Sequence, residues 1–148
     1  MACANGQAGC AEGFAPLFRT SPFLDTAGPF FYKPQGSGFV IGLRVEDRHT
    51  NTSGTLHGGL VATLADIATG YVTSLSQTPP LQMVTASLSV DYVGAAKKGD
   101  WVEAHVSIVK TGRRLAFANT RIRVGNDPVA SARAVFLVLA APSPRPTG

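Results

Sequence analysis

The stretch that decides the fold runs from residue 56 to residue 76 and reads LHGGLVATLADIATGYVTSLS. Its large apolar side chains recur at the spacing of one face of an α-helix. They are Leu56, Leu60, Leu64, Ile67, Tyr71 and Leu75. Thr55 is a preferred N-cap residue, and Pro79 with Pro80 would prevent any continuation of the helix. Alanines and valines fill much of the remaining surface, so the sequence predicts one long helix that is buried all round.

Sequence patterns typical of β-strands occur both before and after this helix. Aromatic and β-branched residues around a turn-forming cluster predict a hairpin before it, and apolar and polar side chains alternate after it. The expected strands cover residues 30–33, 39–45, 84–92, 102–108, 114–124 and 129–140. Short turns separate the last four strands, which predicts an antiparallel meander.

The order of hairpin, helix and strands predicts an α+β fold, with an antiparallel sheet of five to six strands wrapped around one central helix. An open sheet exposes an edge strand, so we expect a partner subunit. A length of 148 residues corresponds to one domain. We place this domain at residues 13–141, between flexible tails at 1–12 and 142–148.

Composition excludes several classes of protein. Apolar residues make up 45% of the chain and charged residues 15%, which argues against disorder. No apolar run approaches the roughly 20 residues that span a bilayer, and the first residues lack the pattern of a secretory signal. The two cysteines, Cys3 and Cys10, have no nearby histidine and no ligand spacing for zinc, so we expect no metal. These features predict a cytoplasmic protein that does not bind a membrane.

Positive charge is concentrated in the second half of the chain. The net charge is +4, and residues 97–133 contain eight basic side chains against three acidic ones. This distribution favours an anionic ligand, with a solvated sheet face as the alternative. Nucleic acid is a poor candidate, because aromatic side chains are not interleaved with the basic ones.

Asp66 is the unusual residue of the predicted helix, because no basic residue occurs between Leu56 and Ser76. A buried carboxylate must be paired or hydrogen-bonded. The small residues around it leave room for a substrate or for a second backbone. They are Gly59, Ala62, Thr63, Gly70 and Thr73. The alternative is a structural aspartate that accepts a hydrogen bond from the hydroxyl of Thr63 or Thr69.

Two glycines, Gly58 and Gly59, begin the helix although each costs roughly 1 kcal/mol relative to alanine. They would expose backbone N–H groups at the positive end of the helix dipole, where an oxyanion could be stabilised. The alternative is a tight entry into the helix. His57 and Asp66 lie on opposite helix faces, about 13 Å apart along the axis, so one chain cannot form a dyad or a metal site from them. No serine-hydrolase, zinc-protease or P-loop motif is present.

The segment Asn51-Thr-Ser-Gly-Thr-Leu-His57-Gly58-Gly59, followed by Leu64-Ala65-Asp66, resembles the signature of hotdog-fold acyl-CoA thioesterases. The similar group is the phenylacetic-acid-degradation type, which is related to 4-hydroxybenzoyl-CoA thioesterases. The strands with Gly99-Asp100 and residues 110–117 resemble it as well, so the resemblance covers roughly residues 30–140. It implies a hotdog fold, a homodimer or homotetramer, and a thioester hydrolase without a cofactor.

The resemblance also implies roles for individual residues. The N–H of Gly58 would polarise the thioester carbonyl with help from Asn51, while Asp66 of the facing subunit would be the nucleophile or general base. Thr85 would help to hold the attacking water, and His57 would be a supporting contact. For Asn51 the alternative is an Asx-turn in its loop, and for Thr85 an ordinary strand threonine.

Coenzyme A carries phosphates, and the basic half of the chain offers residues to hold them. The substrate-binding candidates are Gly59, Tyr71, Lys97, Lys98, Arg113 and Arg114. The acyl group would be aryl or of medium chain length. The alternative function is a hotdog module that binds acyl-CoA without cleaving it, and a hotdog dehydratase or hydratase is a third possibility for which the catalytic pairing is missing.

Overall fold

The structure is a computed structural model that describes residues 9–140. The predicted C-terminal tail and residues 1–8 of the predicted N-terminal tail lie outside the described part. Residues 9–12 lie inside it, and Cys10 and Ala11 pack against a small apolar cluster that contains Phe14, Phe31 and Val40.

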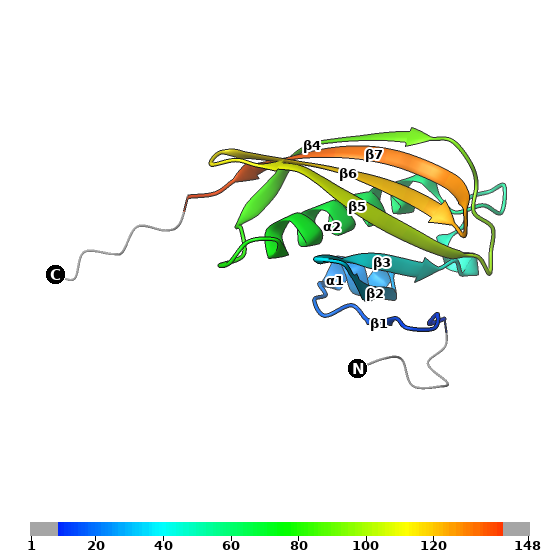
Figure 1. Ribbon diagram of the computed structural model, residues 1–148. Helices are drawn as coiled ribbons and strands as arrows, with labels where there is room; N and C mark the ends of the chain where they lie inside the picture. Colours follow the sequence, from blue (N-terminus) through cyan, green and yellow to red (C-terminus); the bar gives the residue numbers. More distant parts are fainter. Residues whose placement is uncertain (1–8, 141–148) are drawn as a thin grey trace.

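A single antiparallel sheet curls around one long helix, α2 (Figure 1). The predicted α+β class and hotdog architecture are confirmed. The elements are β1 Ala15–Pro16, α1 Pro22–Ala27, β2 Phe30–Gln35, β3 Gly38–Arg44, η1 Asp47–His49, α2 Gly58–Leu75, β4 Met83–Tyr92, β5 Trp101–Thr111, β6 Leu115–Val124 and β7 Asp127–Val138. None of the helices in residues 9–140 is long and apolar enough to cross a membrane.

The sheet has seven strands, not five or six, in the order β1-β2-β3-β5-β6-β7-β4. The additional strand is β1, which has two residues and is too short to show a period in the sequence. The predicted meander is wrong for β4, because β4 pairs with β7 while β5 pairs with β3. Alternation of side chains shows which face of a strand is buried, but it does not show which strand is its neighbour.

The helix also begins later than predicted. Thr55 and Leu56 pair with the loop before β5 instead, since Thr55 bridges to Lys97 and the Leu56 N–H donates to the Ala96 carbonyl at 2.8 Å. The N-cap is therefore His57, whose Nδ1 accepts from the Gly59 N–H at 2.9 Å. The helix ends at Leu75, before the two prolines as expected.

One side of α2 forms the centre of the core. Val61, Leu64, Ala65 and Ala68 are buried against the concave face of the sheet, where Ile41, Leu43, Val102 and Ile122 come from β3, β5 and β6. Burying each large apolar side chain stabilises the fold by roughly 1.5–3 kcal/mol. The other side of α2 is only half-buried at Ala62, Thr63, Asp66 and Gly70. The prediction of a helix buried all round is therefore wrong for the single chain, and the open side is where the candidate site lies.

Candidate active site

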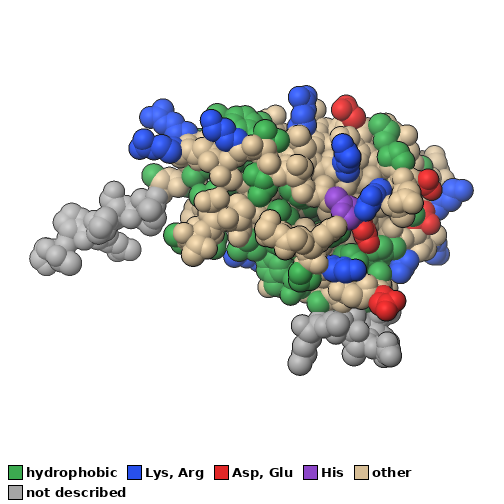
Figure 2. All heavy atoms as spheres, in the orientation of Figure 1, with side chains coloured by type: hydrophobic (Ala, Val, Ile, Leu, Met, Phe, Trp, Pro, Cys, Tyr) green, Lys and Arg blue, Asp and Glu red, His purple; other side chains and the backbone are tan. Residues whose placement is uncertain are grey.

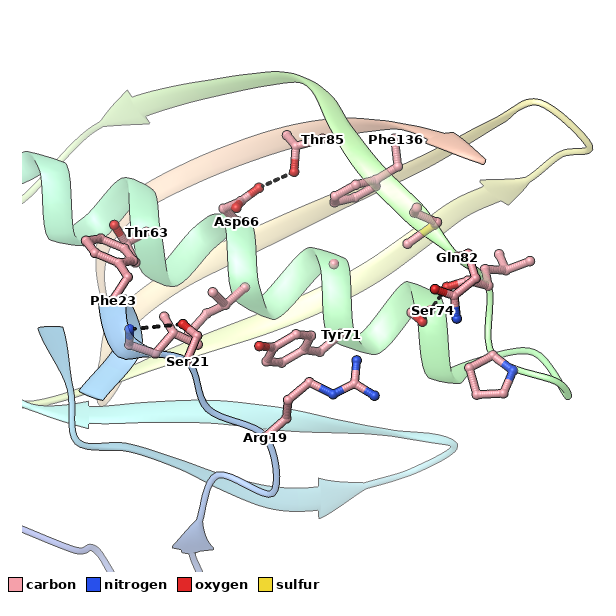
Figure 3. Close-up of a pocket in the computed structure, with 16 residues that line it drawn as sticks. Arg19, Ser21, Phe23, Thr63, Asp66, Tyr71, Ser74, Gln82, Thr85 and Phe136 are labelled. Atoms are coloured by element: carbon pink, nitrogen blue, oxygen red, sulfur yellow. Dashed lines mark hydrogen bonds between the residues drawn. The ribbon is translucent and has the colours of Figure 1, made fainter. Parts of the chain in front are cut away.

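A cavity of about 410 Å³ lies beside the open side of α2 (Figure 3). Helix α2 forms one wall, and β4 with the loop before it forms another. The segment around α1 closes the cavity through Arg19, Ser21, Phe23 and Leu24. The volume falls in the range of small-molecule sites.

Asp66 faces this cavity and is half-buried. Its Oδ1 accepts a hydrogen bond of 2.7 Å from the Oγ1 of Thr85 on β4 (Figure 3). Thr85 points inward because it pairs with Phe136 of β7, which also lines the cavity. The contact joins the helix to the strand that follows it, and it leaves Oδ2 of Asp66 without a protein partner among residues 9–140.

The structural alternative for Asp66 does not hold. The hydroxyl of Thr63 donates to the Gly59 carbonyl at 3.0 Å, and that of Thr69 donates to the Ala65 carbonyl at 2.7 Å. Both threonines thus bond to the helix backbone and not to the Asp66 carboxylate. The hydrogen bond that the carboxylate accepts comes instead from the strand.

The start of α2 offers one free backbone donor. The Gly59 N–H is used by the His57 ring, whereas the Gly58 N–H has no hydrogen-bond partner in the described part of the chain. The Gly58 carbonyl accepts from the Tyr92 hydroxyl at 2.6 Å, which ties the helix start to the end of β4. The sequence predicted that the N–H groups of both Gly58 and Gly59 are exposed. Of these two, only the Gly58 N–H is available to donate to a ligand.

Asn51 holds its own loop together. Its Oδ1 accepts from the N–H groups of Ser53 at 2.9 Å and Thr55 at 3.2 Å, and its Nδ2 donates to the Thr55 hydroxyl at 3.1 Å. The Asx-turn alternative therefore describes this side chain in the single chain. Because an amide carries two N–H donors, the second hydrogen of Nδ2 is still free to reach a ligand.

Within one chain the predicted catalytic residues fall into two groups. Asn51, His57 and Gly58 lie at the start of α2, while Asp66 and Thr85 lie at its middle. Gly58 and Asp66 are about 12 Å apart along the helix axis. Strand β4 contacts both groups, through Tyr92 at one end and Thr85 near the other.

The predicted basic residues also form two separate pairs. Arg113 and Arg114 are exposed in the turn between β5 and β6, where basic side chains gather at one end of the sheet (Figure 2). This turn is close to the cavity, because the Arg114 carbonyl accepts from the N–H of Val138, whose partner on β4 is Met83, a lining residue.

The lysine pair lies in the loop between β4 and β5, beside the start of α2. Lys97 donates its N–H to the Asp100 carboxylate at 2.8 Å, and Lys98 Nζ lies 3.4 Å from the Asp47 carboxylate. The charge of Lys98 is thus partly offset by Asp47. In the described part of the chain, Arg113 and Arg114 have no such acidic partner.

Sequence reasoning placed Tyr71 in the substrate pocket, and Tyr71 does line the cavity. It missed Arg19, whose guanidinium carbon lies 5.7 Å from the centroid of the Tyr71 ring. No motif surrounds Arg19, so only the three-dimensional contact with α2 reveals it. Among residues 9–140, no three His, Cys, Asp or Glu side chains come together as metal ligands.

Comparison with known proteins identifies the family. The family model of the thioesterase superfamily matches residues 53–131, the region that contains Asp66 and Thr85. The chain belongs to the thioesterase superfamily. It is a thioester hydrolase with the hotdog fold, as the resemblance implied.

Three similar proteins come from bacteria and vertebrates. The Pseudomonas aeruginosa protein PA0474, whose name assigns it to the esterases, is 48% identical over 126 residues, which cover 84% of this chain and 94% of that protein. Acyl-coenzyme A thioesterase 13 of Mus musculus is 40% identical over 81 residues, which cover 54% of this chain and 56% of that protein. The crystal structure of zebra fish thioesterase superfamily member 2 superposes with a TM-score of 0.73 at 28% identity, covering 80% and 88% of the two chains.

The hydrogen bond from Thr85 to Asp66 provides the first prediction. In this thioesterase, Thr85→Val keeps the shape of the side chain but removes the donor to a carboxylate, so we expect kcat to fall by about tenfold or more. Thr85→Ser keeps a hydroxyl and should retain most of the activity. Release of free thiol from a thioester substrate measures both variants. A serine variant as impaired as the valine variant would show that the hydroxyl is not what matters.

Proposed function

We propose that this thioesterase hydrolyses the thioester of an aryl or medium-chain acyl-CoA to the free acid and coenzyme A. The observation that carries this proposal is the Asp66 carboxylate, held by Thr85 at the wall of a 410 Å³ cavity. A cavity of this volume suits an acyl group of that size. The name of the mouse relative, an acyl-coenzyme A thioesterase, supports the choice of coenzyme A.

The chemistry follows from the donors and acceptors of the site. The Gly58 N–H and the free hydrogen of Asn51 Nδ2 would donate to the carbonyl oxygen as it becomes an oxyanion. Asp66 would either take a proton from the attacking water or attack the carbonyl carbon itself and form an anhydride that water then cleaves. In both routes the C–S bond breaks and the sulfur leaves as the thiol of coenzyme A.

Both routes require the start of α2 in one subunit to meet Asp66 of another. The edge of β4 that faces away from β7 has no strand partner among residues 9–140. If two copies of β4 pair antiparallel, the Thr85 end of one strand lies opposite the Tyr92 end of the other. Thr85 bonds to Asp66 and Tyr92 bonds to Gly58, so this pairing would bring Asp66 next to the partner's Gly58. It would also cover the open edge.

A homotetramer would require a second contact surface, and the outer face of the sheet offers one. Val84, Leu115 and Leu137 form a cross-strand row on β4, β6 and β7, and they are 48%, 41% and 44% exposed. Adjacent exposed apolar side chains of this kind are typical of protein interfaces. We therefore propose that dimers associate through this face.

Asp66→Asn tests the chemical role of the carboxylate. The amide keeps the shape of the side chain but can neither accept a proton nor attack, so we expect kcat to fall by on the order of 10²- to 10⁴-fold with little change in KM. Steady-state hydrolysis of a panel of aryl- and fatty-acyl-CoA esters measures this. An active Asp66→Asn would overturn the mechanism, whereas wild-type protein that binds but cleaves no acyl-CoA would favour the binding-module alternative.

Mixing two inactive variants tests the shared site. In a dimer of one Asn51→Ala and one Asp66→Ala subunit, one site carries both defects and the other carries neither. Random exchange of subunits should therefore restore about a quarter of wild-type activity, because half of the dimers then hold one intact site out of two. A mixture of Asp66→Ala with Asp66→Asn is the control and should stay inactive. Restoration in neither mixture would indicate that each site uses a single chain.

Replacement of Arg113 and Arg114 tests whether they bind the nucleotide of coenzyme A. Because Arg113 and Arg114 are exposed and lack acidic partners, we expect the double alanine variant to raise KM for acyl-CoA and to weaken its salt dependence. A truncated thioester without the nucleotide should be hydrolysed as by wild type. The matched comparison is Lys98→Ala, because Asp47 partly offsets the charge of Lys98. Equal losses on both substrates would show that the arginines support the fold.

A further inference from the structure

The guanidinium group of Arg19, on the segment between β1 and α1, lies at the wall of the cavity. Arg19 lines the cavity together with Tyr71 (Figure 3). The guanidinium carbon lies 5.7 Å from the centroid of the Tyr71 ring, within the range of a cation–π contact. Phe18 packs against the same ring with a centroid distance of 5.9 Å. Arg19 is exposed, and these aromatic contacts hold its guanidinium beside the cavity.

The hydrogen-bonding capacity of Arg19 is unused. It makes no hydrogen bond or ion pair with any residue in the described part of the chain. By contrast, Arg48 pairs with Glu46 at 2.9 Å, and Arg44 donates to the Gly99 carbonyl at 3.0 Å. A guanidinium in a cation–π contact still has N–H groups for other partners, and their fork matches the two oxygens of a carboxylate.

Asp66 and Arg19 are the two charged side chains that line the cavity. Between them, Ile67 and the Tyr71 ring provide apolar surface. Tyr71 follows Asp66 by five residues, which places it about 7.5 Å farther along the helix axis and about 140° around it. The two Cα atoms are therefore roughly 9 Å apart and the side-chain ends farther, so a chain of roughly ten carbons is needed to cover the distance. The long pantetheine arm keeps the phosphates of coenzyme A much farther than this from the sulfur.

We propose that Arg19 binds a terminal carboxylate on the acyl group, so that the preferred substrates are thioesters of dicarboxylic acids of roughly ten carbons. This inference rests on the proposed acyl-CoA hydrolysis and adds the substrate class. The thioester carbonyl lies at Asp66, the methylene chain passes Ile67 and Tyr71, and the free carboxylate pairs with Arg19. Hydrolysis then releases the dicarboxylic acid and coenzyme A.

The test compares two substrates of equal chain length. Sebacyl-CoA carries the terminal carboxylate and decanoyl-CoA lacks it, and the measured quantity is the ratio of their kcat/KM values. The wild type should prefer sebacyl-CoA, and Arg19→Gln should lower the ratio by about tenfold or more, because a charge-assisted pair is lost. Arg19→Glu should instead favour 10-aminodecanoyl-CoA. The matched control is Arg44→Gln, which removes another stacked arginine, over Trp101 at 5.1 Å, and should leave the ratio unchanged.

Other results would overturn the inference. A wild type that prefers decanoyl-CoA, or a ratio that Arg19→Gln leaves unchanged, contradicts a carboxylate site at Arg19. An equal rise in KM for both substrates, which disappears with the pantetheine thioesters, shows that Arg19 binds a phosphate of coenzyme A instead. Wild-type protein that hydrolyses neither thioester contradicts the proposed function itself, on which the inference rests.

Discussion

Val61, Leu64, Ala65 and Ala68 of α2 pack against the concave face of the sheet, and this contact determines which residues remain for chemistry. The helical period of 3.6 residues means that side chains offset by half a turn must face away from the sheet. Thr63, Asp66 and Gly70 occupy that side and line the cavity. The apolar packing that stabilises the fold therefore also fixes the orientation of the carboxylate. A change in the helix register would bury Asp66 in the core, and no lysine or arginine is buried there among residues 9–140 to pair with it.

Strand β4 supplies the residues that contact Asp66 and the start of α2. Thr85 is aligned with Asp66 only because β4 crosses to the far edge of the sheet and pairs with β7. The same strand places Tyr92 against the Gly58 carbonyl at the start of α2. One strand thus fixes the distance between the two halves of the candidate site, and its outer edge is where a second copy would supply the missing half. In the proposed dimer, the contact between subunits and the catalytic geometry would depend on the same ten residues.

The sequence predicted the elements whose cause is local. The helical spacing in α2 and the alternation in β5 to β7 reflect burial of one face, and both patterns are visible without a neighbour. In β4 the predicted alternation does not mark a buried face, because Val84 and Tyr92 are exposed and the register shifts between Thr85 and Ser87. The motif around Asn51, His57 and Asp66 led to the correct family. What could not be predicted depends on contacts between distant segments. The pairing of Thr55 and Leu56 with residues 96–97 delays the helix start, and Arg19 reaches the cavity only because its segment folds over Tyr71.

The two glycines at the start of α2 illustrate how one local pattern can have two causes. A Cβ atom on Gly59 would lie 3.1 Å from His57 Nδ1, the atom that accepts the Gly59 N–H, so a side chain there would disturb the cap. Gly59 is thus explained by the structure of the helix start alone. At Gly58 a Cβ atom would meet the Tyr92 ring at 3.4 Å, a closer fit than most contacts but not a clash with backbone. Its N–H nevertheless has no partner among residues 9–140, and leaving such a group unbonded is unfavourable unless a ligand or water satisfies it. Because the His57 ring caps the Gly59 N–H, the Gly58 N–H is the donor that remains at the positive end of the helix dipole. A developing oxyanion would be stabilised most strongly at this position.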